Sequence, residues 1–265
     1  MAVARLDDPQ LIATYDKSGM LGHIRGLPQQ CRLAWQQGLS LKPPKTYSAV
    51  RRIVVLGMGG SAIGADLAAA VLAHEGGMLL TVHRGYNLPF PVDEKTLVVA
   101  SSYSGNTEET LSGFEQALGT SAKVVAFTTG GRLGEMAQDR RIPLFLFTGQ
   151  GPPRASLGFS FVGLLGMLNK LVLIQDKASQ ISEMLDVMER LCQKWHSIVP
   201  QAQNLAKQLA VSLQDKLPIM YGGDFLIPVA LRWKTQVNEN SKAWAFYRPL
   251  PELDHNDVVG YQFPA

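Results

Sequence analysis

Hydroxyl side chains crowd a short segment that begins where an apolar run ends. Residues 96–100 are apolar apart from the first, and Ser102, Ser104 and Thr107 follow, with Gly105 among them. An apolar set at helical spacing begins at residue 111, so the hydroxyls lie between a predicted strand and a predicted helix. Free backbone N–H groups and the positive end of the helix dipole attract anions at such a junction. The segment therefore predicts a phosphate-binding turn.

The same segment also allows a simpler interpretation, in which it only caps the helix. Asn106 is followed three residues later by Glu109, which is the spacing of a capping box. A cap needs one such residue, whereas three hydroxyls share this turn. We therefore favour phosphate binding.

Three charged or titratable residues have the chemistry to move protons on a sugar. Glu239 lies at a predicted helix end, where a carboxylate beside a C1–C2 bond can carry a proton between the two carbons. His255 lies in a polar loop, and imidazole titrates near neutral pH, which suits ring opening. Arg154 follows the fifth apolar run and can hold an anion or a developing enediolate. Each residue alone is also compatible with an ordinary surface position.

A glycine-rich turn at residues 57–64 resembles part of a dinucleotide-binding fingerprint, but two required residues are missing. Ala62 stands where a dinucleotide fingerprint has its third glycine, and the run 81–84 lacks the expected acidic residue. Backbone without side chains still lets a sugar or phosphate approach closely. We expect Gly59, Gly60 and Ser61 to line the substrate.

The elements that must position these residues follow a regular alternation. Short apolar runs alternate with helical stretches at 52–56, 79–83, 96–100, 123–127 and 143–147. Continuous apolar runs are typical of strands buried on both faces, so the pattern predicts an α/β fold with a doubly wound parallel sheet. Ligands of such sheets bind at the carboxyl ends of the strands. Three turns lie on that edge: the glycine turn at residues 57–61, the hydroxyl turn at residues 101–107, and the turn at residues 128–132.

The chain divides into three predicted parts. Residues 1–48 form a helical N-terminal segment, and residues 49–175 form a first subdomain that binds the sugar phosphate. Residues 176–265 contain linker helices and a partial second subdomain, with strands expected at 217–222 and 243–246 around a helical run. The strand, glycine turn and helix recur there as in the first half.

Composition limits the classes of function. The net charge of +3, without long basic runs, argues against a nucleic-acid partner. The two cysteines lie far apart, which indicates a reducing, cytoplasmic compartment, and no cluster suggests a metal or another cofactor. The N-terminus lacks the apolar core of a signal peptide. Residues 157–174 are apolar but carry Asn169 and Lys170, so we expect a buried helix and no membrane span.

Together these motifs resemble the sugar isomerase (SIS) superfamily, and more closely its bifunctional phosphoglucose/phosphomannose isomerases. The motifs that carry the resemblance are Gly57-Met-Gly-Gly-Ser61, Ser102-Tyr-Ser-Gly-Asn-Thr107, Thr129-Gly-Gly-Arg-Leu133, Pro153-Arg-Ala155, Asn238-Glu-Asn240 and Asp254-His-Asn256. Their order along the chain and their positions at strand ends match as well. The Ser102–Thr107 motif alone marks only the superfamily, and the later glutamate and histidine motifs make the narrower match specific.

The resemblance implies a fold, a reaction and a set of roles. Two SIS subdomains with flavodoxin-like parallel sheets, the second incomplete, would form a homodimer that interconverts glucose 6-phosphate and mannose 6-phosphate with fructose 6-phosphate. Ser102, Ser104 and Thr107 would hold the phosphate. Glu239 would transfer the proton through a cis-enediol, Arg154 would stabilise that intermediate, and His255, contributed by the partner subunit, would help to open the ring.

The resemblance also raises two alternatives. Members of the family continue with further strand and helix and a lysine that assists ring opening, and this sequence has no counterpart after Ala265. The sequence is therefore also compatible with a fragment or truncated paralogue, or with a regulator that binds sugar phosphates without turning them over. The isomerase half of an amino-sugar enzyme, such as glucosamine 6-phosphate synthase, is the other alternative, and no residue here marks its Schiff-base lysine.

Overall fold

Among the described residues, three α-helices and a short 3₁₀ helix at Lys45–Ala49 precede the first strand. The computed structural model describes residues 6–149 and 151–262, so Gln150 and the extreme ends of the first and last predicted parts lie outside the described residues. The helices are α1 (Pro9–Tyr15), α2 (Met20–Arg25) and α3 (Leu27–Ser40). Most of residues 9–40 is therefore helical.

A five-stranded parallel sheet forms the centre of the larger unit. Its strands are β1 (Arg52–Leu56), β2 (Leu79–His83), β3 (Thr96–Ser102), β4 (Lys123–Thr128) and β5 (Leu144–Leu146). The strand order is β2-β1-β3-β4-β5, and all neighbours pair in parallel. All five predicted strands and their parallel arrangement are thus confirmed.

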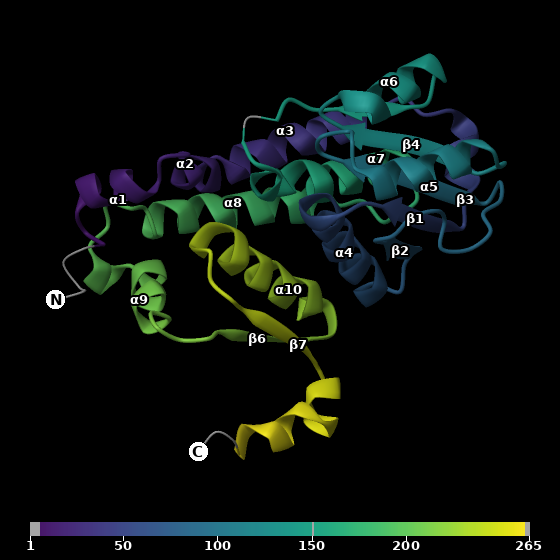
Figure 1. Cartoon of the computed structure of the whole chain (residues 1–265). Coiled ribbons are helices and arrows are strands. Elements are labelled where there is room, and N and C mark those ends of the chain that lie inside the picture. Colours follow the sequence, from purple (N-terminus) through teal and green to yellow (C-terminus); the bar gives the residue numbers. More distant parts are fainter. Residues whose placement is uncertain (1–5, 150, 263–265) are drawn as a thin grey trace.

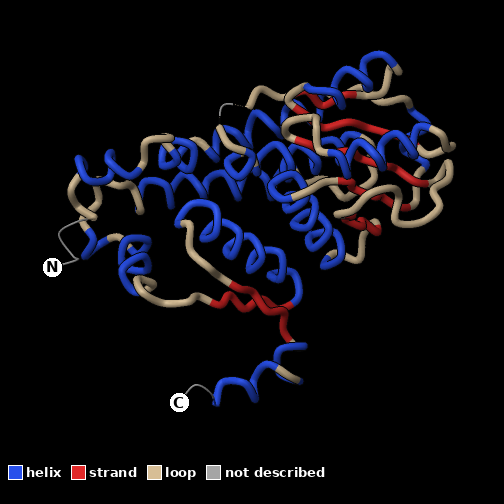
Figure 2. Tube along the Cα trace, in the orientation of Figure 1, coloured by secondary structure: helices blue, strands red, loops and turns tan. Residues whose placement is uncertain are grey.

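Helices cover both faces of this sheet, as Figures 1 and 2 show. One face packs against α5 (Glu108–Leu118) and α6 (Gly131–Asp139), and Phe114 of α5 is completely buried there. The other face packs against α3, α4 (Gly59–His74) and α7 (Leu164–Lys170). Neighbouring residues of a strand point to opposite faces, so Val54 and Val55 of β1 enter different cores. This two-sided burial explains why the strands read as continuous apolar runs.

The apolar segment after β5 is a buried helix, as predicted. A wide, π-type helical stretch at Gly158–Gly163 leads directly into α7, and the segment packs between α3 and α4. Two further helices, α8 (Ala178–Lys194) and α9 (Leu205–Ser212), lead to the smaller unit. Within residues 6–149 and 151–262, no helix has the length and apolar character needed to cross a bilayer.

The smaller unit is a parallel strand–helix–strand arrangement. It comprises β6 (Ile219–Gly223), α10 (Ile227–Gln236) with a π-type extension at Val237–Ser241, and β7 (Phe246–Leu250). Helix α10 packs on both strands and also on α4, which joins the two units. Figure 1 shows the segment after β7 extending away from α10 and from the larger sheet.

The predicted position of the last strand was wrong by several residues. We expected a strand at 243–246, but pairing begins only at Phe246, whose N–H donates to Pro218 O at 3.1 Å. Lys242 has a left-handed φ of 55°, and Asn238 Nδ2 donates to Ala243 O at 2.9 Å. These residues therefore turn the chain after α10 and are not free to pair.

Candidate active site

Side chains within the hydroxyl turn form hydrogen bonds to each other and to the backbone of the turn. Ser102 Oγ and Thr107 Oγ1 lie 2.8 Å apart, and Gly105 N donates to Ser102 Oγ at 3.1 Å. Ser104 is exposed, and its Oγ accepts from Asn106 N at 3.2 Å. Gly105 has a left-handed φ of 70°, which glycine adopts without strain. Ser102 is buried, so the turn presents the hydroxyls of Ser104 and the half-buried Thr107 just before the N-terminus of α5, where an anion is stabilised.

The capping-box interpretation of this turn is wrong. Helix α5 begins at Glu108 with Thr107 as its N-cap residue, and Thr107 makes no side-chain cap because its hydroxyl is paired with Ser102. Asn106 instead points across the site, and its Oδ1 accepts from Arg132 N at 3.0 Å. The asparagine therefore ties the hydroxyl turn to the first turn of α6.

Replacing Asn106 with alanine should lower the free energy of unfolding by about 1 kcal/mol, the usual effect of losing a side-chain cap at a helix N-terminus. Urea denaturation measures this change. Glu109→Ala is the matched control, since a capping box would require Glu109 and the observed geometry does not. Equal losses for the two variants would contradict the assignment of Asn106 to α6.

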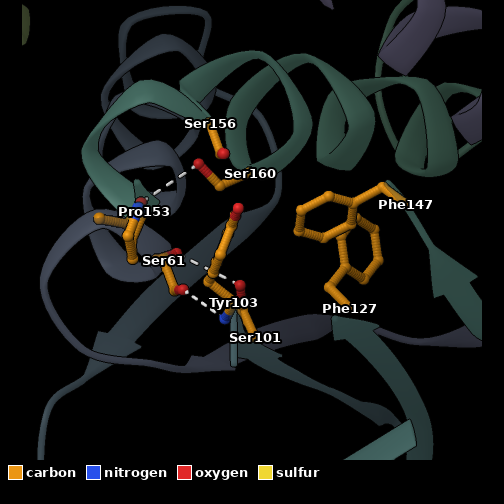
Figure 3. A pocket seen from close by; sticks show the side chains of 9 residues that line it. Ser61, Ser101, Tyr103, Phe127, Phe147, Pro153, Ser156 and Ser160 are labelled. Carbon is orange, nitrogen blue, oxygen red and sulfur yellow. Dashed lines mark hydrogen bonds between the residues drawn. The ribbon is translucent and has the colours of Figure 1, made fainter. Parts of the chain in front are cut away.

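The glycine turn lies directly against the hydroxyl turn and the segment around Arg154. Ser61 Oγ accepts from Tyr103 N at 3.1 Å. A Cβ atom on Gly60 would lie 3.0 Å from Pro153 O and 3.4 Å from Arg154 N, which is a tight fit, so glycine favours this close approach. Figure 3 shows Ser61, Tyr103 and Pro153 around a small cavity. Its volume of about 10 Å³ is close to the space for one water molecule.

Arg154 and Glu239 meet across the two units. Arg154 Nη1 lies 3.7 Å from Glu239 Oε2, and Arg154 Nε donates to Asn240 Oδ1 at 2.7 Å. The Arg154 side chain is 20% exposed and the Glu239 side chain 44%, so the carboxylate remains accessible to a small molecule. Lys242 Nζ donates to Glu239 O at 2.6 Å and closes the extension of α10. A guanidinium and a carboxylate therefore lie side by side at the junction of the two units.

The structure brings together most of the residues predicted for the site. Ser61 accepts from Tyr103 of the hydroxyl turn, and Gly60 lies against the backbone of Arg154. Arg154 in turn meets Glu239. Gly59 begins α4 in the same turn. His255 is the exception. It is exposed in a short 3₁₀ turn, Glu252–His255, on the segment that extends away from α10 (Figure 1).

Sequence reasoning missed three residues that hold the Arg154 segment. Gln30 Nε2 donates to Ala155 O at 3.0 Å, Asn240 accepts from Arg154, and Arg232 Nη2 donates to Arg154 O at 2.6 Å. One signal was available for Arg232, which precedes Glu239 by about two turns of the predicted helical run and would share its face in a regular α-helix.

The structure offers neither a reactive Cys31 thiol nor, among the described residues, a metal-binding cluster. Burial raises the pKa of the Cys31 thiol to about 12, so it stays protonated at neutral pH. Among the described residues, histidine, cysteine and acidic side chains form no group of three or more that could hold a metal ion.

Two family models match the chain. An SIS domain matches residues 46–142, and a bacterial phosphoglucose isomerase C-terminal SIS domain matches residues 202–265. The first match contains the glycine turn and the hydroxyl turn, and the second contains Glu239 and His255.

Curated relatives match most of the chain. A bifunctional phosphoglucose/phosphomannose isomerase from Caldicellulosiruptor bescii is 41% identical over 92% of this chain and 73% of its own length. One from Aquifex aeolicus is 36% identical over 83% of this chain and 65% of its own length. The chain thus spans about two thirds to three quarters of the lengths of these two relatives.

A solved structure supports the fold. A hypothetical protein from Thermus thermophilus superposes with a TM-score of 0.70 at 20% identity, and the superposition covers 100% of this chain and 67% of that chain. At this identity, the likeness concerns the fold alone.

Proposed function

Because this chain belongs to the bifunctional phosphoglucose/phosphomannose isomerase family of SIS proteins, we propose that it is an aldose–ketose isomerase of hexose 6-phosphates. It interconverts glucose 6-phosphate and mannose 6-phosphate with fructose 6-phosphate. The observation that carries this proposal is the pairing of Arg154 with Glu239 at 3.7 Å beside a hydroxyl turn built for an anion.

The phosphate end of the substrate fixes its position. Ser104 and Thr107 donate hydroxyl hydrogen bonds to the phosphate oxygens at the N-terminus of α5, where the helix dipole adds to the attraction. Ser102 is buried and supports Thr107 through the contact between their hydroxyls. Gly59, Gly60 and Ser61 line the sugar, because a turn without side chains lets the substrate approach the backbone. Binding energy from the phosphate then holds the distant C1–C2 bond next to Glu239.

Glu239 moves the proton. Its carboxylate removes the proton from C2 of the open-chain aldose, and the electron pair of that bond forms the C1–C2 double bond as negative charge moves to O1. Arg154 lies beside the carboxylate and stabilises this charge. The hydroxyl proton of O2 then passes to O1, and the proton held by Glu239 is delivered to C1, so that O2 becomes the carbonyl of the ketose and O1 its hydroxyl. Glucose and mannose epimers converge on the same cis-enediol because C2 is planar there.

His255 completes the proposal as a group that a second copy of the chain supplies. Ring opening needs an acid–base group at the ring oxygen, and imidazole suits it at neutral pH. The segment that carries His255 extends away from its own α10, which favours action across a homodimer. We further propose that residues 49–175 and 176–265 act as the two subdomains of each subunit, in the cytoplasm.

Solvent exchange tests the reaction type. In D₂O, proton transfer through an enediol should place deuterium on C2 of the aldose formed from fructose 6-phosphate, because Glu239 exchanges its proton with solvent between steps. Proton NMR of the product at C2 measures this incorporation. Turnover without any incorporation would indicate direct hydride transfer or a shielded proton, and would overturn the role of a solvent-accessible base.

A further inference from the structure

Arg232 joins the two residues that the proposed reaction uses, although the reaction itself gives it no role. Arg232 lies on α10, and its Nη2 donates to the backbone oxygen of Arg154 at 2.6 Å. In the amide orientation of Gln236 that satisfies its neighbours, Gln236 Oε1 also accepts from Arg232 Nη1 at 2.8 Å. The guanidinium is thus held by its own helix and reaches across to the other unit.

The charge of Arg232 is well suited to this position. The side chain is half-buried, and burial lowers its pKa while the Glu239 carboxylate raises it. An arginine remains protonated even so, because its ordinary pKa is far above neutral. The Glu239 carboxylate acts on the charge of Arg232 and also pairs with Arg154, so Arg232 supplies a fixed positive charge near the ion pair. A neutral donor would make the same hydrogen bond without that charge.

The Arg154 segment is held from both sides. Gln30 donates to Ala155 O at 3.0 Å and fixes the segment to the larger unit. Arg232 binds the neighbouring carbonyl from the smaller unit, whose α10 also carries Glu239 at its end. Any shift of α10 relative to the larger unit therefore acts on Arg154 and Glu239 together.

We propose that Arg232 is a positioning residue that couples the backbone of Arg154 to α10 and so fixes the Arg154 guanidinium relative to the Glu239 carboxylate. It touches neither the substrate nor the reacting atoms. This inference rests on the proposed isomerase function for its kinetic consequence, whereas its structural consequence is independent of that function.

The test compares Arg232→Met, Arg232→Lys and a control, Lys234→Met, which removes one positive charge from the same helix. Misplacing reacting groups by about 1 Å can cost about 100-fold in rate, so we expect kcat of Arg232→Met to fall about 10- to 100-fold. KM for glucose 6-phosphate should change less than about twofold, because the phosphate turn is intact. Arg232→Lys should recover part of kcat, since an ammonium still donates to Arg154 O. Lys234→Met should keep wild-type kinetics.

Two readouts separate positioning from a general structural role. Proton transfer becomes slower in Arg232→Met, so its isotope effect with glucose 6-phosphate deuterated at C2 should exceed that of the wild type. Hydrogen exchange of residues 154–160 should quicken in Arg232→Met and not in Lys234→Met. Exchange that quickens across the whole chain, or unchanged kcat and unchanged local exchange, would overturn the inference. If the wild type shows no turnover, the proposed function fails, and local exchange alone decides the position of Arg232.

Discussion

Replacing Glu239 with glutamine should reduce turnover about 1000-fold, because the amide cannot accept the C2 proton. A loss of this size corresponds to about 4 kcal/mol of transition-state stabilisation. Glutamine has the same shape, and its amide oxygen can still face Arg154 Nη1, which lies 3.7 Å from the carboxylate in the native chain. Fructose 6-phosphate should therefore bind almost as tightly as to the wild type. Steady-state kinetics and calorimetry measure the two effects separately.

The control for this substitution is Glu183→Gln on the exposed side of α8, which removes an equal charge far from the site. It should leave kcat unchanged. Retained turnover in Glu239→Gln would eliminate Glu239 as the base, whereas a loss of binding equal to the loss of turnover would mean that the carboxylate acts in binding and not in proton transfer.

Gly105→Ala should cause the largest loss of stability among substitutions in the hydroxyl turn. A Cβ atom there would lie 1.9 Å from Gly130 O, and the backbone has a φ of 70°. The steric clash and the left-handed backbone both disfavour alanine. Gly130 cannot move away without opening the contact between the hydroxyl turn and α6. We expect the free energy of unfolding to fall by about 3 kcal/mol or more, with phosphate affinity reduced as well. Chemical denaturation and calorimetry with fructose 6-phosphate measure these changes.

Gly76→Ala is the matched control for the backbone effect. Gly76 follows α4, has a φ of 65°, and would have no atom within 4 Å of its Cβ. It should lose only about 1 kcal/mol, the cost of a left-handed backbone for alanine. Equal losses for Gly105→Ala and Gly76→Ala would show that the turn tolerates a side chain, and would contradict the tight packing of Gly105 on Gly130.

The sheet can be predicted from the sequence because strands that are buried on both faces appear as continuous apolar runs. Continuous apolar runs such as 52–56 and 123–127 identify the strands. Because the strands are parallel, the turns that follow their carboxyl ends lie on one edge of the sheet. The hydroxyls of Ser102 and Thr107 could be assigned to one turn for the same reason. Local pattern and global fold agree at these positions.

The remaining features depend on contacts that no local pattern encodes. Asn106 has the spacing of a cap for α5, but it binds Arg132, because the chain folds α6 next to the turn. The last strand begins later than its apolar run, since Lys242 and Ala243 complete the turn after α10. Arg232 has its role only once α10 packs beside the Arg154 segment. Tertiary packing decided all three.

A coupled assay of the purified chain with fructose 6-phosphate tests the central claim most directly, provided that glucose 6-phosphate and mannose 6-phosphate are measured separately. We expect both products to appear with the wild type, and the Glu239→Gln variant to form them about 1000-fold more slowly. Formation of neither product by the wild type, with sugar phosphate still bound in calorimetry, would contradict the isomerase and identify a sugar-phosphate-binding protein that keeps the hydroxyl turn without the chemistry.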